Sequence, residues 1–198
     1  MVVLFVILKR YMPNLEHIRH SLAHLLGAAV LELYPGSKLA IGPAIDDGFY
    51  YDIDVAGKIS DMDLPAIEDK MREILKTWKG FEGQEVSAEE AKKQFAGNPY
   101  KEELINELAE KGEQITLYTS GTFTDLCRGG HVESIKEIDP KAFKLSRLAG
   151  AYWRGDEKNP QLTRIYGLAF ATKDELKQHA SALEEAKKRD HRKIGKEL

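Results

Sequence analysis

The sequence has little cysteine and no long hydrophobic run. Cys127 is the only cysteine among 198 residues, so no disulfide can form within the chain, which is typical of proteins from a reducing compartment. The most apolar stretch, MVVLFVIL, is far shorter than the roughly 20 residues of a membrane span, and Lys9 and Arg10 follow it. We therefore expect a cytoplasmic protein that does not associate with membranes, and we interpret residues 1–13 as a strand or a remnant.

The sequence also lacks an excess of basic residues. It contains 29 Lys and Arg against 32 Asp and Glu, which gives a net charge of −3, so a nucleic acid would have to bind a local patch. With 42% hydrophobic and 31% charged residues, the composition is that of a globular protein with a sizeable core. Nothing in the composition indicates an oligomeric state.

What the sequence does contain is a mixture of helical and strand patterns. Helical periodicity between the cap Asn14 and the stop Pro35-Gly36 predicts one long N-terminal helix. The other expected helices are residues 63–80, 87–95, 100–112 and 173–198, and the expected strands are residues 38–45, 48–55, 114–126, 142–155 and 161–172. The turn Asp46-Asp47-Gly48 and the polar loop DEKNP predict two hairpins, at residues 38–55 and 142–172. Because helices and strands occur in clusters rather than in alternation, we expect an α+β fold in which an antiparallel β-sheet packs against helices.

Two histidines lie four residues apart in the long N-terminal helix. The side chains of His20 and His24, in RHSLAH, can converge on one point, which is a common spacing of metal ligands. No Glu follows His20, so the HExxH motif of zinc proteases is absent. The face expected to pack on the sheet is formed by Leu15, Ile18, Leu22, Leu25, Leu26, Ala29 and Leu33. The histidine pair shares the opposite face, predicted to be one wall of a cleft, with His17, Gly27, Ala28 and Leu31.

A second pair, Cys127 and His131, lies in the turn CRGGH. Gly129 and Gly130 let the backbone bend sharply enough to bring both side chains to one side. Together with the histidine pair of the helix, they would form a tetrahedral zinc shell. Spacing alone leaves a metal site and a metal-free site equally open.

Six segments of the chain, taken in order, carry a resemblance to a known family. They are RHSLAHLLGAAV, AIGPAIDDGFYYDID, DLCRGGH, FKLSRLAGAYWRGD, LTRIYGLAF and EEAKKRDHRKIGKEL. From about His17 to the last residue, the chain resembles the editing domain, or second additional domain, of threonyl-tRNA synthetases of the bacterial and eukaryotic type. Editing domains of alanyl-tRNA synthetases share the HxxxH and CxxxH pairs, but RGDEKNPQLTRIYG favours the threonyl branch. The resemblance divides the chain into residues 1–13, an editing domain at 14–172, and a C-terminal linker helix at 173–198 that would lead toward a catalytic domain.

The resemblance implies that the chain removes serine from threonine-specific tRNA by hydrolysing the aminoacyl ester. Serine lacks one methyl group of threonine, and a binding pocket gains only about 1–3 kcal/mol of discrimination from such a group, so a second, hydrolytic site is needed. The expected partners are the 3′ end of serine-charged threonine tRNA and the other domains of the synthetase. This chain alone is not expected to aminoacylate tRNA, because a class II catalytic domain does not fit within its 198 residues.

The resemblance also implies which residues form the site. The implied catalytic residues are His20, His24, Lys101, Asp125, Cys127 and His131. In our hypothesis His20 and Lys101 position or activate waters, whereas Asp125 and the remaining histidines orient the substrate. Cys127 would line the pocket, and the competing interpretation is a Cys-His nucleophile that forms an acyl-enzyme. The residues expected to bind substrate are Tyr51, Arg128 and Tyr152.

The resemblance changes the metal interpretation and leaves other functions open. Alanyl-type editing domains hold zinc at these two pairs, whereas the threonyl branch works there without an obligatory ion, so no cofactor is expected to be required. If zinc binds, its ligands would be His20, His24, Cys127 and His131. The alternatives are a zinc-stabilised RNA-binding or interaction module without turnover, and a free-standing deacylase of the alanyl type that acts in trans. Bacterial relatives usually have proline at position 130, so the glycine there leaves the pose of His131 open.

Overall fold

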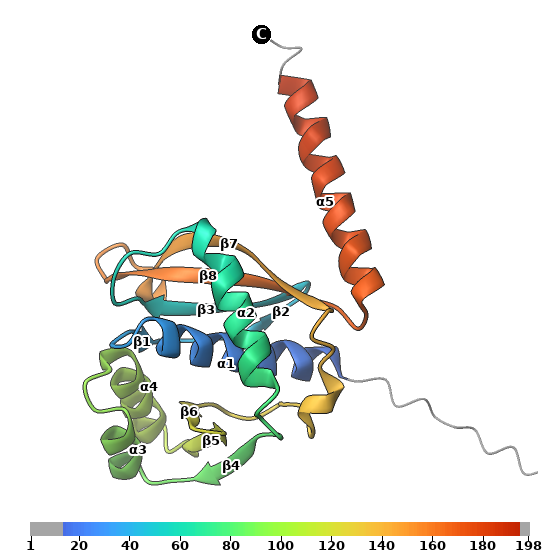
Figure 1. Cartoon of the computed structure of the whole chain (residues 1–198). Coiled ribbons are helices and arrows are strands. Elements are labelled where there is room, and N and C mark those ends of the chain that lie inside the picture. Colours follow the sequence, from blue (N-terminus) through green and yellow to red (C-terminus); the bar gives the residue numbers. More distant parts are fainter. Residues whose placement is uncertain (1–13, 195–198) are drawn as a thin grey trace, which may run out of the picture.

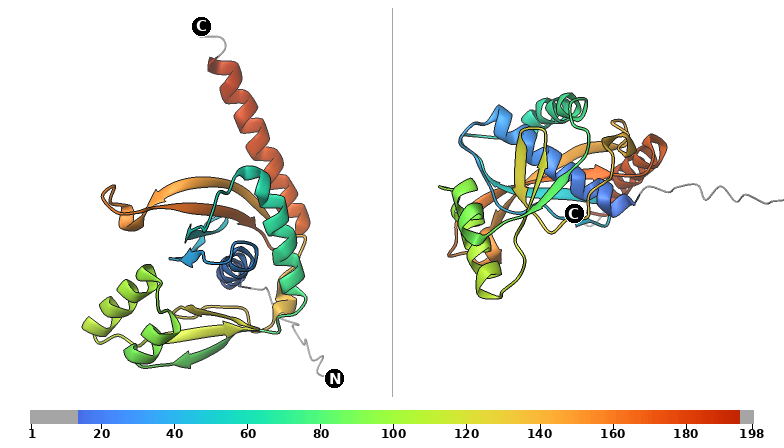
Figure 2. Two further views of the ribbon diagram at one scale, coloured as in Figure 1. Left: turned by 60° about the vertical axis from the view of Figure 1, so that its left-hand side comes forward. Right: turned by 90° about the horizontal axis from the view of Figure 1, so that it is seen from below.

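The structure is a computed structural model that describes residues 14–194 (Figure 1). Three layers are stacked in it: a five-stranded sheet, the helix α1 (Leu15–Leu33) and a three-stranded sheet, so that α1 lies between the two sheets (Figure 2, left). Residues 1–13, which we interpreted as a strand or a remnant, and residues 195–198, at the end of the expected terminal helix, lie outside the described part of the chain.

Every strand pairing among the described residues is antiparallel. The five-stranded sheet has the order β1-β3-β8-β7, with β2 also paired to β3, and the three-stranded sheet has the order β4-β5-β6. The strands are β1 (Lys38–Leu39), β2 (Ala44–Ile45), β3 (Gly48–Asp54), β4 (Glu82–Glu85), β5 (Thr116–Ser120), β6 (Phe123–Leu126), β7 (Phe143–Tyr152) and β8 (Gln161–Ala169). The predicted α+β class and the antiparallel pairing are confirmed, but the strands form two sheets rather than one.

Further helices surround the layers. They are α2 (Leu64–Leu75), α3 (Ala88–Gln94), α4 (Pro99–Glu110) and α5 (Lys173–Ile194). Helix α2 packs beside α1, α3 and α4 form a pair next to the three-stranded sheet, and α5 extends away from the layers (Figure 1). None of the helices within residues 14–194 has the length and apolar character that crossing a bilayer requires.

The start of α4 is fixed by Asn98. Its side-chain oxygen accepts the backbone N–H groups of Tyr100 and Lys101, and Pro99 occupies the first helical position, where no N–H is needed. The amide nitrogen of the same side chain donates to the carbonyl of Leu39 over 2.9 Å. The cap therefore both begins the helix and ties it to β1.

Both faces of α1 are largely buried, which differs from the sequence prediction at three positions. Leu33, placed on the core face, is 38% exposed, whereas Gly27 and Ala28, placed on the wall of a cleft, are buried. A Cβ on Gly27 would lie 3.2 Å from Tyr51 of one sheet and 3.5 Å from Phe123 of the other. Because a sheet covers each side of the helix, amphipathic periodicity could not separate a core face from an open one.

The main core lies between α1, α2 and the inner face of the five-stranded sheet. Its fully buried members include Leu25, Leu26, Phe49, Ile53, Ile67, Met71 and Ile165. The two predicted hairpins, at residues 38–55 and 142–172, are observed in this sheet. Strand β4 was not predicted, because its four residues, EGQE, are polar or glycine and all exposed.

Candidate active site

A cavity of about 440 Å³ lies between α1, α4, β3 and β6. Its wall contains most of the side chains that we expected at the site, namely His20, His24, Tyr51, Lys101, Asp125, Cys127 and Arg128. His131 borders this group, because its ring stacks on that of His20 with 4.6 Å between centroids. Tyr152 is 44% exposed at the end of β7 and does not line the cavity. The structure thus brings together eight of the nine expected residues.

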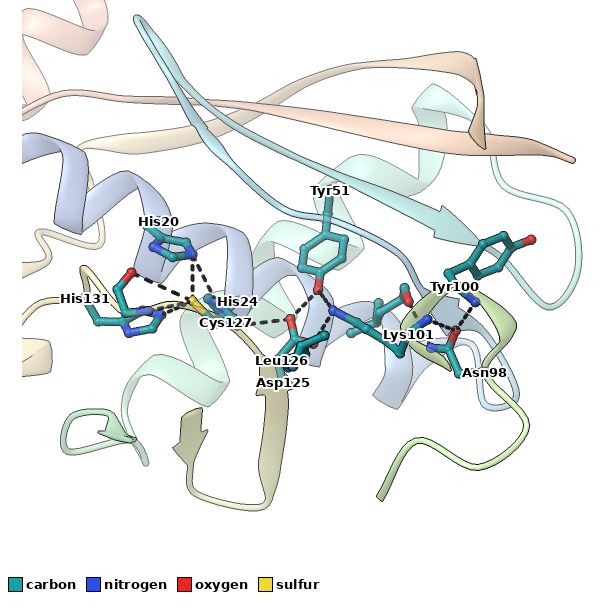
Figure 3. Close-up of polar contacts among 12 residues, drawn as sticks. His20, His24, Tyr51, Asn98, Tyr100, Lys101, Asp125, Leu126, Cys127 and His131 are labelled. Atoms are coloured by element: carbon teal, nitrogen blue, oxygen red, sulfur yellow. Dashed lines mark hydrogen bonds and ion pairs between the residues drawn. The ribbon is translucent and has the colours of Figure 1, made fainter. Parts of the chain in front are cut away.

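Three buried polar side chains, Tyr51, Lys101 and Asp125, form what we call the ionic cluster (Figure 3). Lys101 Nζ forms an ion pair with Asp125 Oδ1 and also donates to the Tyr51 oxygen over 3.3 Å. The Tyr51 hydroxyl donates to Asp125 Oδ2. Burial, followed by the charge of Asp125, raises the pKa of Tyr51 well above its usual value, so the phenol stays protonated. The cluster therefore holds one buried cation and one buried anion in direct contact.

Each member of the ionic cluster comes from a different element. Tyr51 lies on β3, most of whose residues are buried, and alternation along β6 buries Phe123 and Asp125. Lys101 lies in the first turn of α4. The Tyr51 ring is held against Gly42, where an added Cβ would lie only 2.4 Å from a ring carbon. Position 42 therefore requires glycine for the close approach of its backbone to the ring.

The other half of the site, which we call the imidazole–thiol cluster, consists of His20, His24, Cys127 and His131. His20 Nε2 lies 3.3 Å from His24 Nε2 and 3.3 Å from Cys127 Sγ (Figure 3). Cys127 Sγ lies 3.7 Å from His131 Nε2 and accepts the backbone N–H of Gly129 over 3.3 Å. The two pairs that the sequence placed a hundred residues apart therefore meet at one point.

Burial shifts the titratable groups of the imidazole–thiol cluster toward their neutral forms. It lowers the pKa of His20, and it lowers that of His24 well below the usual value, with further contributions from His20 and Lys101. Burial, together with the other two imidazoles, lowers the pKa of His131 to about 2. Burial also raises the pKa of Cys127 to about 11. At pH 7 the cluster contains neutral imidazoles and a protonated thiol.

His24 connects the two clusters. Its Nδ1 lies 3.3 Å from Asp125 Oδ2, close enough for an ion pair, but the two atoms do not form a hydrogen bond. Because the pKa of His24 is far below 7, the imidazole is neutral, and we treat the contact as a dipole beside a carboxylate rather than as a salt bridge. The position of His24 thus depends on both halves of the site.

The four donor atoms of the imidazole–thiol cluster fit a tetrahedral metal ion. They all lie within 4.8 Å of one another. Zinc bound at about 2.0 Å to nitrogen and about 2.3 Å to sulfur separates its ligands by roughly 3.3–3.6 Å. The contacts of 3.3, 3.3 and 3.7 Å within the cluster are close to these values. A carboxylate beside a ligating imidazole, as at His24, is also usual around zinc.

Two aromatic residues that the sequence analysis did not single out complete the site. The ring of Phe81 stacks on His131 with 4.2 Å between centroids and 13° between planes, and the ring of Tyr118 lies 4.6 Å from His131. A Cβ on Gly129 would lie 2.5 Å from the Tyr118 hydroxyl, so the turn approaches this ring closely. Phe81 directly precedes the unpredicted β4, and no pattern in the sequence indicated its contact.

One segment of the chain matches a known protein family. Residues 115–166 match the family described as the threonyl and alanyl tRNA synthetase second additional domain. This segment includes Asp125, Cys127 and His131, together with most of the β7–β8 hairpin. The residues contributed by α1, β3 and α4 lie outside the matched segment.

The chain is also similar to threonine–tRNA ligases. It is 56% identical to that of Rubrobacter xylanophilus over 181 residues, which are 91% of this chain and 28% of the relative. The ligase of Borreliella burgdorferi is 53% identical over 180 residues, 91% of this chain and 31% of the relative. That of Dehalococcoides mccartyi is 52% identical over 185 residues, 93% of this chain and 31% of the relative. The chain thus spans about three-tenths of the length of these curated relatives.

Proposed function

Because the chain belongs to the family of the second additional domain of threonyl and alanyl tRNA synthetases, we propose that its cavity hydrolyses an aminoacyl-tRNA ester, with serine-charged threonine tRNA as substrate. The observation that carries the proposal is the cavity, in which a neutral His20 and the ammonium group of Lys101 line one space. An aminoacyl ester is already activated. Its hydrolysis needs a positioned water, a group that takes the water proton and a donor for the oxyanion.

His20 is the group that we propose takes the proton from water. Burial lowers its pKa, so the imidazole is unprotonated at pH 7 and can accept a proton. His20 is only partly buried, whereas His24 is fully buried, so water reaches His20 more easily. His24 contacts His20 through the two Nε2 atoms and thereby orients it.

Lys101 is the donor that we propose for the oxyanion. An ammonium group has three N–H donors and no acceptor. One is directed to Asp125 and one to the Tyr51 oxygen, so one remains for the substrate or for water. As water adds to the carbonyl carbon, negative charge develops on the carbonyl oxygen, and a preorganised cation stabilises this charge. The bond between the carbonyl carbon and the ribose oxygen then breaks, and this oxygen takes the proton that His20 accepted from water, which restores the neutral imidazole.

Asp125 holds this arrangement together in our proposal. Its Oδ1 accepts from Lys101 and from the backbone N–H of Leu126 at 2.8 Å, and its Oδ2 accepts from Tyr51 and lies beside His24. A carboxylate has about four acceptor positions, and these donors engage three of them. We therefore propose that Asp125 positions Lys101, which modifies the substrate-orienting role that our hypothesis from the sequence gave it.

Cys127 and a possible zinc ion have supporting roles in the proposal. With its pKa raised to about 11, the Cys127 thiol lines the cavity as a neutral group. Zinc bound by His20, His24, Cys127 and His131 would supply a Lewis acid that polarises an ester carbonyl. The steps described above involve only groups of the protein and do not require an ion.

We propose that the selectivity for serine over threonine comes from the rigid part of the cavity wall that the Tyr51 ring forms. The Tyr51 ring is packed against Gly42 and against Gly27 of α1, so it cannot retreat from an additional methyl group. Arg128, whose side chain is 76% exposed beside Glu113, would contact the RNA at the opening of the cavity. Tyr152 remains a predicted substrate contact without a place in the cavity.

We propose that the site acts together with the other domains of a threonine–tRNA ligase in the cytoplasm. The relatives support this proposal, because the aligned region is only about three-tenths of their length. In this arrangement residues 14–172 form the hydrolytic domain, and α5 leads toward the catalytic domain. The 3′ end of the tRNA would carry the mischarged amino acid from one domain to the other.

The test of the proposal is deacylation of two substrates. We expect the purified chain to hydrolyse serine-charged threonine tRNA much faster than threonine-charged threonine tRNA, and His20→Ala to abolish the difference by removing the base. His179→Ala, which removes a histidine outside the cavity, is the matched control. Equal rates for the two esters, or no hydrolysis of either, would contradict the proposal. Faster hydrolysis of serine-charged alanine tRNA would instead identify an alanyl-type deacylase.

The donor geometry of the imidazole–thiol cluster favours one second candidate, a zinc-stabilised module without turnover. That function predicts about one zinc per chain after mild chelation and unfolding when a strong chelator removes it. Metal analysis combined with thermal denaturation in the presence and absence of chelator distinguishes it. Deacylation that persists in the metal-free protein would exclude it.

A further inference from the structure

The connection between β7 and β8 has an unusual backbone at Arg154. This residue has φ 59° and ψ 13°, and it is the only residue other than glycine with a positive φ in the described part of the chain. The left-handed conformation is unfavourable for a residue with a Cβ and persists where surrounding contacts impose it. The contacts of the Arg154 side chain should therefore show which interactions hold the backbone in this conformation.

Arg154 and its neighbour Trp153 bind one face of α4. Trp153 Nε1 donates to Glu103 Oε2 over 2.8 Å, and Arg154 Nε donates to Glu103 Oε1 over 3.1 Å. Arg154 Nη2 forms an ion pair with Glu107, one helical turn later. The guanidinium also lies 4.9 Å from the centre of the Trp153 ring. Both oxygens of Glu103 are thus bound by the β7–β8 connection, and the left-handed turn folds the guanidinium back toward the helix.

Helix α4 also carries Lys101, which lies on the side facing the cavity. Besides the bond from Lys101 to Tyr51, the polar contacts from the start of α4 to the five-stranded sheet are Asn98 to Leu39 and the Tyr100 hydroxyl to Asp54, the latter over 3.3 Å. Beyond the first turn, α4 makes polar contacts with the connection between β7 and β8, and within the described residues these are the contacts of Trp153 and Arg154. The sheet contributes Tyr51 to the ionic cluster, so the distance between α4 and the sheet sets the distance between Lys101 and Tyr51.

We propose that Arg154 is a positioning residue for the reaction: it clamps α4 to the β7–β8 hairpin and thereby holds the ammonium of Lys101 at Asp125 and Tyr51. The inference rests on the proposed deacylase function for its catalytic consequence, but the clamp itself is a structural property. Arg154 touches no reacting atom. A small displacement of Lys101 matters because the alignment of a buried donor with the developing oxyanion depends steeply on distance.

The variant that tests the clamp is Arg154→Gly, because glycine adopts the left-handed conformation without strain, so the substitution removes the side chain and its contacts while the turn can keep its backbone. We expect the rate constant for single-turnover deacylation of serine-charged threonine tRNA to fall by about tenfold, with half-saturation changed less than about twofold, since loss of alignment affects the chemical step. The control is Arg147→Ala, on the same hairpin, whose guanidinium lies 3.9 Å from the centre of the Tyr166 ring and away from α4. It should leave both quantities unchanged.

A second measurement does not depend on activity. Lys101 Nζ is 2% exposed, so an amine-modifying reagent followed by mass spectrometry should label it very slowly in the original chain. Arg154→Gly should label Lys101 faster while Lys58, which is exposed and far along the chain, is labelled at an unchanged rate. Thermal denaturation shows that the variant is folded, and Glu103→Gln, which keeps an acceptor for Trp153, should give a smaller effect in the same direction.

The outcomes separate the two proposals. Slow deacylation by the original chain combined with faster labelling of Lys101 in Arg154→Gly would contradict the proposed function and support the clamp. An active original chain whose rate and Lys101 labelling are the same in Arg154→Gly would overturn the clamp and leave the function standing. A fall in half-saturation affinity alone, with an unchanged rate constant, would also overturn it, because it would make Arg154 a tRNA contact.

Discussion

The ionic cluster keeps its charges and pairs them, whereas the imidazole–thiol cluster on the same cavity avoids charge. Lys101 and Asp125 are each 2% exposed and in direct contact. By contrast, burial lowers the pKa of His131 to about 2 and raises that of Cys127 to about 11. A buried ion is tolerated only beside its partner, while a buried imidazole remains neutral without one. Removing one partner should therefore cost much more in the ionic cluster than in the imidazole–thiol cluster.

The largest effect is expected for Lys101→Met, which leaves Asp125 buried without its cation. We expect the free energy of unfolding to fall by about 3–5 kcal/mol, because the unpaired carboxylate keeps its desolvation penalty. Urea denaturation measures the change, and deacylation should be lost as well. The matched control is Lys92→Met, which removes an exposed lysine from α3 and should have little effect. If Lys101→Met cost no more than the control, the comparison between the clusters would fail.

A smaller effect is expected for Tyr51→Phe. This variant keeps the ring but removes the hydroxyl that donates to Asp125, so we expect a loss of about 1–3 kcal/mol in unfolding free energy. Tyr50→Phe is the control, since the ring of Tyr50 lies on the same strand with Arg164 over it and its hydroxyl has no partner in the ionic cluster. Equal losses in the two variants would mean that the Tyr51 hydroxyl does not support Asp125.

The same contrast explains which parts of the site the sequence could predict. His20 and His24, and likewise Cys127 and His131, are local pairs whose spacing already indicates a shared function. Lys101 was identified only by resemblance, because its contact with Tyr51 joins residues 50 positions apart and no local pattern encodes it. The capped helix α1 and the two hairpins were predicted from short-range signals.

The features that were missed depend on long-range packing. The second sheet covers Gly27 and Ala28 on the predicted cleft face of α1, although His20 and His24 on the same face do line the cavity. This sheet includes β4, whose residues have no strand pattern. Phe81 stacks on His131 only because the two segments meet in the folded chain. Arg154 was part of a recognised motif, AYWRGD, but its left-handed backbone and its contacts with α4 require the structure.

The imidazole–thiol cluster should make stability depend on pH. His131 has an ordinary pKa of 6.5 and a folded pKa of about 2, so the unfolded chain binds a proton below pH 6.5 that the folded chain does not. Stability is therefore unaffected at higher pH and falls as the pH decreases below 6.5, by about 1 kcal/mol per pH unit for this group. Urea denaturation at pH 7, 6 and 5 should show a shallower decrease for His131→Gln. His179→Gln, outside the cavity, should keep the original slope, and an unchanged slope in His131→Gln would show that this imidazole is protonated in the folded chain.

The smallest effect is expected for Cys127→Ala, because it removes a neutral group that makes only long contacts. With a pKa of about 11, the thiol is ionised in about one molecule in 10,000 at pH 7, so it is a poor nucleophile. We expect single-turnover deacylation to change by less than about tenfold, which is what loss of a lining group rather than of a nucleophile would cause. Mass spectrometry of the acid-quenched reaction should detect no seryl adduct in the original chain. A trapped thioester at Cys127, together with loss of activity in the alanine variant, would mean that the imidazole–thiol cluster generates a charge after all, and the contrast with the ionic cluster would no longer hold.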